Sequence, residues 1–222
     1  MWLVAKEERI AMEPSKFQSK LQELEKRNWD RKALESRCHN LMKHGIPAKT
    51  LNRDVLTFNR QEILDRVQRR AEEYNYILRN CAQSTGLALM EEFGLGNIEI
   101  VKALSPFPGF GGTGWMCGAV TGSLIAFGLQ FGSDDLLNEE GVRASIGITR
   151  QFMPRFEREV GAVTCPQIQE NVVFGRYMDP AAGPENMEAF EQAKGFEKCG
   201  LVPGIGARIA ADIIIETLCT AS

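Results

Sequence analysis

The segment from Met116 to Phe131, "MCGAVTGSLIAFGLQF", restricts the fold more than any other part of the sequence. It is almost entirely apolar, and its small residues recur at intervals of three and four: Gly118, Ala119, Gly122, Ser123 and Ala126. This spacing predicts a buried helix rather than a strand. The small side chains would allow another helix, or a cofactor, to approach its backbone closely.

Helical periodicity extends through most of the remaining chain. A second long helix is expected from about Asn59, because Ile63, Val67, Ala71 and Tyr74 share one stripe. It continues or restarts toward Gly94, a typical helix end. Further helices are predicted at 13–44, 139–158, 166–173, 184–197 and 203–219. Since no region alternates apolar and polar residues convincingly, we predict an all-α multi-helix bundle with a glycine-rich loop and little or no sheet.

Composition narrows the classes of function. The 222 residues have a net charge of -3 and 44% hydrophobic content, as ordinary globular proteins do. Residues 1–73 carry 16 basic and 12 acidic side chains, but the two signs alternate at helical spacing, so no nucleic-acid partner is expected. The longest apolar run has about fifteen residues, short of the ~20 that span a bilayer. No secretory signal is recognisable, and we expect a cytoplasmic protein without a membrane span.

The glycines before the apolar helix resemble a nucleotide-binding pattern. Gly109, Gly111 and Gly114 spell G-x-G-x-x-G, and Asp134 follows twenty residues after Gly114. A dinucleotide site also needs a strand that runs directly into the first glycine. Here Ser-Pro-Phe-Pro separates "NIEIVKAL" from the loop, and no βαβ alternation follows. A glycine loop that turns tightly is the simpler interpretation.

The six cysteines fall into two groups. Cys38 and Cys219 lie within amphipathic helices and are expected to pack in the core. The other four stand at or close to the predicted start of a helix: Cys81, Cys117, Cys165 and Cys199. The helix dipole and free N–H groups there stabilise a thiolate, the form that binds metal. Their spacing matches no zinc ribbon or ferredoxin run. A four-thiolate site and four buried thiols without a ligand both remain open.

The order of these motifs resembles a known family. A cysteine in "NCAQS", then "CGAVTG" in an apolar glycine-rich segment, then two single cysteines is similar to the C-GCAxxG-C-C family of redox-active proteins. The motif residues are Cys117, Gly118, Ala119 and Gly122. The resemblance covers roughly residues 60–219, and we therefore divide the chain into a charged helical extension, 1–58, and a four-cysteine helical redox domain, 59–222.

The resemblance implies a redox function, with an iron-sulfur cluster of two or four irons as its cofactor. The ligands would be Cys81, Cys117, Cys165 and Cys199. Because four thiolates fill all the protein-ligand positions, no iron is free to bind a substrate, and the expected function is one-electron transfer. Backbone amides at nearby glycines would contact the cluster: Gly111, Gly112, Gly114, Gly118 and Gly122. Trp115 and Met116 would shield it from water.

A redox partner protein or oxidoreductase is the expected partner, and the amphipathic N-terminal helices are compatible with a homodimer. Two alternatives stay open: an enzyme, such as an oxidoreductase, that uses the cluster or thiols on a small substrate, and a dithiol-disulfide protein without metal. The sequence designates no catalytic residue and does not decide between an oxidoreductase and its electron-transfer subunit.

Overall fold

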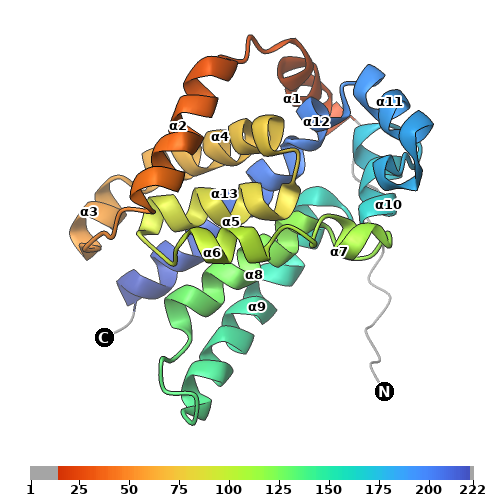
Figure 1. Cartoon of the computed structure of the whole chain (residues 1–222). Helices are drawn as coiled ribbons and strands as arrows, with labels where there is room; N and C mark the ends of the chain where they lie inside the picture. The colour runs from red at the N-terminus through yellow and green to blue at the C-terminus, as the bar shows by residue number, and fades with distance from the viewer. Residues whose placement is uncertain (1–14, 221–222) are drawn as a thin grey trace, which may run out of the picture.

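The computed structural model describes residues 15–220, and over this range the fold is all-α, as predicted (Figure 1). Residues 15–220 contain no sheet, and the isolated β-bridge there joins Met116 to Thr164. No helix in the described range is long and apolar enough to cross a membrane. The first residues of the predicted extension, 1–14, and the last two of the chain lie outside the described residues.

Five long helices form the centre of the molecule. They are α4 (Arg60–Leu78), α5 (Cys81–Phe93), α8 (Gly118–Phe131), α9 (Glu139–Val160) and α13 (Leu201–Thr220). Helix α5 is packed between its neighbours, and Leu89 and Met90 are fully buried. The predicted stripe on α4 is buried as expected, since Val67 and Ala71 have no exposed surface and Tyr74 is 1% exposed. Core packing therefore explains why these segments are helical.

The N-terminal helices lie across one side of this centre. They are α1 (Ser15–Lys26), α2 (Arg31–His44) and α3 (Arg53–Phe58). The prediction of a single helix over 13–44 is wrong, because α1 ends at Lys26 and α2 begins at Arg31. Asp30 accepts a hydrogen bond from the Ala33 N–H and starts α2 as a separate helix. Leu41 and Leu56 join the main core, whereas Phe17 and Leu24 of α1 form a small cluster with Leu201.

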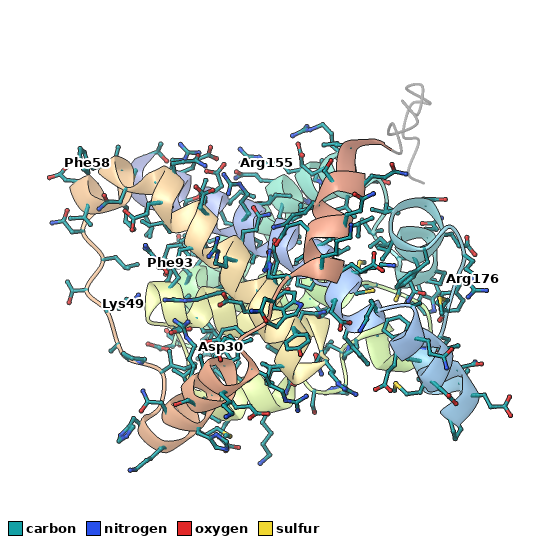
Figure 2. The ribbon with its side chains drawn as sticks, turned by 90° about the horizontal axis from the view of Figure 1, so that it is seen from above. Asp30, Lys49, Phe58, Phe93, Arg155 and Arg176 are labelled. Carbon is teal, nitrogen blue, oxygen red and sulfur yellow. The ribbon has the colours of Figure 1, made fainter. Side chains whose placement is uncertain are left out.

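Most of the short elements gather at one end of the molecule, near the starts of α5 and α8, while α6 (Ile98–Ala103) lies alongside α5. The others are α7 (Gly109–Gly112), α10 (Cys165–Ile168), η1 (Gln169–Val173), η2 (Pro180–Ala182), α11 (Pro184–Gln192) and α12 (Gly195–Cys199). Figure 2 shows Arg176 at this end and Phe58 of α3 at the other. The helix predicted at 184–197 is interrupted, because Lys194 adopts a left-handed conformation and begins α12.

Candidate functional site

The four cysteines of the motif all lie where a helix begins or two helices meet. Cys81 is the first residue of α5, Cys117 is the N-cap of α8 and Cys165 is the first residue of α10. Cys199 ends the short helix α12, two residues before α13 begins. The prediction of N-terminal positions is therefore confirmed for three cysteines, while Cys199 lies between two helices.

A short backbone pairing joins the segments of Cys117 and Cys165. The Cys117 N–H donates to the Val163 carbonyl at 2.9 Å, and the Cys165 N–H donates to the Trp115 carbonyl at 2.8 Å. Together with the bridge between Met116 and Thr164, these bonds hold the two cysteines side by side although 48 residues separate them. No pattern in the sequence predicts this contact between distant segments.

Glycines on α8 bring Cys81 and Cys117 together. A Cβ at Gly118 would collide with the Cys81 sulfur and lie 2.6 Å from the Ala82 nitrogen. A Cβ at Gly122 would lie 2.5 Å from the Ala82 carbonyl oxygen and 2.9 Å from the nitrogen of Gly86. Because these are backbone atoms, α8 packs against α5 only with glycine at both positions. The predicted small-residue stripe therefore positions one thiol against the other.

The Cys81 sulfur is the natural thiolate of the group. Hydrogen bonding from the Cys117 thiol lowers the pKa of Cys81, and the backbone N–H groups of Gly118, Cys81 and Gly109 lower it further against the effect of burial. The same interaction, with burial, raises the pKa of Cys117 well above its usual value of 9.0. Of the two thiols, Cys81 is therefore the one that loses its proton more readily.

Cys165 and Cys199 lie close enough to Cys81 for its charge to affect their pKa values. Burial and the negative charge at Cys81 raise the pKa of Cys165 to about 11, although the Gln169 amide donates to its sulfur at 3.6 Å. Burial, followed by the charges of Cys165 and Cys81, raises the pKa of Cys199 well above 9.0. Each of these thiols is therefore within electrostatic reach of Cys81. The sequence could not show this proximity.

The two remaining cysteines lie elsewhere. Cys38 on α2 and Cys219 on α13 are partly buried against the main core, as predicted. Cys219 accepts a hydrogen bond from the Thr57 hydroxyl at 3.3 Å. They supply matched controls for any test of the other four.

The glycine loop forms a left-handed turn beside Cys165. Gly109, Phe110, Gly111 and Gly112 all have φ between +54° and +78°, and the Gly112 N–H donates to the Pro108 carbonyl at 2.9 Å. A Cβ at Gly109 would lie 3.8 Å from the Cys165 sulfur. No strand precedes this loop within the described chain: "NIEIVKA" contains α6, capped by the Asn97 side chain. The loop therefore lacks the preceding strand that a dinucleotide-binding site requires.

The five glycines predicted to contact a cofactor differ in their surroundings. Gly118 and Gly122 lie in the α5–α8 interface, and the Gly118 amide faces Cys81. The positions where a Cβ would stand on Gly111, Gly112 and Gly114 are nearest to Pro106, Ala181 and Pro166, respectively. Sequence reasoning missed Gly109, whose amide lowers the pKa of Cys81 and whose Cβ position would lie 3.8 Å from the Cys165 sulfur. The sequence feature that could have identified Gly109 is its position as the first glycine of the loop.

The side chain of Trp115 does not shield the cysteines. It is 68% exposed, so the prediction of a shielding role is wrong for this residue. The backbone carbonyl of Trp115 instead accepts a hydrogen bond from the Cys165 N–H. This bond holds the backbone of Trp115 in place while the indole ring is exposed to solvent. Met116 is partly buried against the core, as its predicted role requires.

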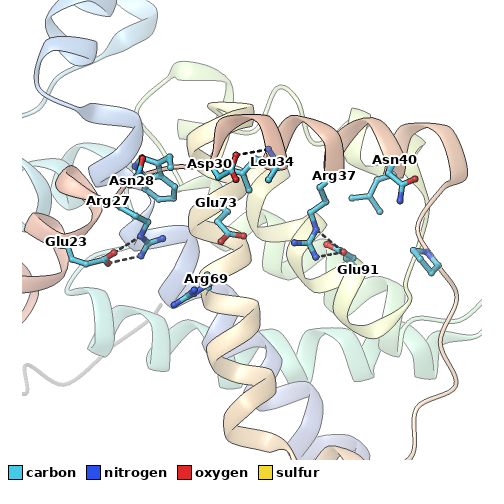
Figure 3. A pocket seen from close by; sticks show the side chains of 14 residues that line it. Glu23, Arg27, Asn28, Asp30, Leu34, Arg37, Asn40, Arg69, Glu73 and Glu91 are labelled. Carbon is cyan, nitrogen blue, oxygen red and sulfur yellow. Dashed lines mark hydrogen bonds and ion pairs between the residues drawn. The ribbon is translucent and has the colours of Figure 1, made fainter.

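A polar pocket of about 740 Å³ lies away from the cysteines, between α1, α2 and α4 (Figure 3). Its charged side chains largely pair with one another. Arg27 donates to Glu23 and Glu72, and Arg37 donates to Glu91 at 2.9 Å. Because most of these charges are already paired, we do not take this pocket as the functional site.

The fold and site define a class of all-helical protein with four cysteines at or close to the ends of separate helices. The sequence matches the family model described as "Putative redox-active protein (C_GCAxxG_C_C)" over residues 79–213, more than half of the chain. The chain therefore belongs to this redox-active family. No curated protein and no solved structure matches the sequence. The match leaves α1 to α4 outside it, and the boundary between residues 58 and 59 stays a prediction.

Proposed function

We propose that this protein is a cytoplasmic redox protein that holds an iron-sulfur cluster and transfers single electrons to a partner protein. The ligands would be Cys81, Cys117, Cys165 and Cys199. The observation that carries the proposal is that Cys81, Cys117 and Cys165 come from separate segments that contact one another through Gly118, Gly109 and the Met116–Thr164 bridge. Cys199 is near enough for the charges of Cys165 and Cys81 to raise its pKa.

Four thiolates can hold either a single zinc ion or an iron-sulfur cluster, and the two differ in the spacing of the sulfurs. Over residues 15–220, no group of three or more histidine, cysteine, aspartate or glutamate side chains is arranged to hold a metal ion. One ion such as zinc would draw all four sulfurs to about 2.3 Å from a common centre. A cluster takes its thiolates at different irons and so accepts wider spacing. Thiols that interact without this tight arrangement fit the second case better.

The protein's own groups would stabilise the negative charge at such a centre. When bound, the cluster supplies a one-electron couple and the cationic irons that keep clustered thiolates deprotonated. The amides of Gly109, Cys81 and Gly118 face the Cys81 sulfur, and the Gln169 amide donates to Cys165. Donors at ligand sulfurs favour the reduced, more negative state and raise the reduction potential.

A second candidate function is reversible disulfide formation between Cys81 and Cys117. Their mutual hydrogen bond favours it, because it pairs a thiol of lowered pKa with a protonated neighbour. The Cys81 thiolate would attack a disulfide of a partner protein and release one partner thiolate. The Cys117 sulfur, after losing its proton, would then attack Cys81, release the partner's second thiolate and leave an intramolecular disulfide.

Six single Cys→Ser variants separate the two functions. Protein purified without oxygen is analysed for iron and acid-labile sulfide, and its free thiols are counted before and after mild oxidation. For a cluster, iron and sulfide are present and fall in the variants at Cys81, Cys117, Cys165 and Cys199, but not in Cys38→Ser or Cys219→Ser. For a disulfide, no iron is found, and the loss of two thiols on oxidation depends on Cys81 and Cys117 alone. Unchanged behaviour in all six variants contradicts both.

A further inference from the structure

The hairpin formed by α8 and α9 carries an apolar surface at its tip. In Figure 1 this hairpin extends away from the body of the molecule. Leu136 and Leu137, in the connection, are 94% and 90% exposed, while Val142 and Ile146, on α9, are 60% and 50% exposed. Large exposed apolar side chains that gather on one part of a folded protein commonly mark a contact surface.

One stripe of α9 combines these apolar residues with charges of both signs. Glu139, Val142, Ile146 and Arg150 follow one another at intervals of three and four, so they share a face. The buried stripe lies on the other side of the helix, through Ile148 and Phe152. The exposed stripe is therefore acidic at its N-terminal end, apolar in the middle and basic at Arg150.

This charge order is self-complementary. If two copies of α9 pack antiparallel about a twofold axis, Glu139 of each copy lies opposite Arg150 of the other, and Val142 of each lies against Ile146 of the other. Within the described chain, Arg150 has no ion-pair partner, and Glu139 has an exposed one in Arg143 at 3.0 Å. A 22-residue helix, about 33 Å long, provides room for the whole stripe.

We propose that the protein forms a twofold homodimer through the exposed stripe of α9 and the adjoining leucines. A twofold contact is isologous, so the Glu139–Arg150 pair would occur twice, on either side of the apolar centre. An anionic membrane is a poorer occupant, because Asp134, Asp135, Glu139 and Glu140 surround the leucines. This inference does not depend on the cluster and places the dimer contact on α9 rather than on the N-terminal helices.

Charge reversal provides the test. The molar mass of the full chain is measured by light scattering and sedimentation over a range of concentrations, for the wild type and for Glu139→Arg, Arg150→Glu and the double variant. We expect a dimer for the wild type and at least about tenfold weaker dimerisation for each single variant, because like charges then face each other twice. The double variant restores the pairs with exchanged signs and should dimerise as the wild type does.

An apolar variant and a control complete the experiment. Ile146→Ser should weaken the dimer about tenfold or more, whereas Phe58→Ser, at an even more exposed site on α3, should not. Circular dichroism establishes that each variant is folded. A monomeric wild type overturns the proposal, including one that binds phosphatidylserine vesicles through this tip. A dimer whose double variant is no stronger than the single ones also overturns it.

Discussion

Replacing Gly122 with alanine tests the close contact between α8 and α5 that positions Cys81 against Cys117. In an open helix, glycine to alanine gains roughly 0.5–1 kcal/mol of stability. At Gly122 the new Cβ would meet backbone atoms of α5 at 2.5 and 2.9 Å, distances at which α5 must move. Overpacking of this kind costs about 1–3 kcal/mol, so we expect a net loss of roughly 1–2 kcal/mol.

Gly128 on the same helix is the matched control, because a Cβ there would have nothing within 4 Å. Gly128→Ala should be neutral or more stable than the wild type. Thermal unfolding of a chain this size shifts by about 2–4 °C for each kcal/mol, so Tm should fall by several degrees in Gly122→Ala. If Gly122→Ala proves as stable as Gly128→Ala, the proposed reason for the glycine stripe is wrong.

Three further predictions concern the charges and the exposed surface. Arg27→Met should destabilise the fold by about 1–3 kcal/mol in urea unfolding, because the Glu72 carboxylate it contacts at 2.7 Å is only 1% exposed; Arg31→Met, which breaks an exposed pair with Glu35, should leave the unfolding midpoint nearly unchanged. The bond from Arg27 lowers the pKa of Glu23 from 4.5 to about 2, so its stabilising contribution is complete above pH 4.5 and disappears as the pH falls through 2. Unfolding measured across this range should therefore be less pH-dependent in Glu23→Gln, and an identical slope would contradict the assignment. Trp115→Ala should leave stability within about 0.5 kcal/mol of the wild type, since the ring is 68% exposed; a large loss would show that the ring packs.

The helices could be predicted because their apolar periodicity is local. The stripe of α4, the end of α5 at Gly94 and the buried helix α8 all follow from spacing. The errors occurred where a cap or a special conformation interrupts the periodicity. Asp30 starts a new helix within the predicted 13–44, and Lys194 does so within 184–197. Such breaks depend on single residues that the surrounding pattern hides.

The sequence could nominate residues for the candidate site but could not show how they are arranged. The motif around Cys117 and the positions of the other cysteines near helix starts identified the four thiols. Their arrangement depends on contacts between distant segments, such as the Cys165–Trp115 bond and the approach of Gly118 to Cys81. Gly109 and Trp115 show what local sequence could not predict. Neither the position of Gly109 beside the Cys165 sulfur nor the exposure of the Trp115 ring follows from the residues around it.

X-ray absorption at the iron edge of anaerobically purified protein tests the central claim most directly, because it reports the atoms around the metal. The account predicts a first shell made only of sulfur, together with iron–iron scattering, in the wild type and in the Cys38→Ser and Cys219→Ser variants. A shell of nitrogen and oxygen, a single isolated iron, or protein without iron would contradict a cluster held by Cys81, Cys117, Cys165 and Cys199.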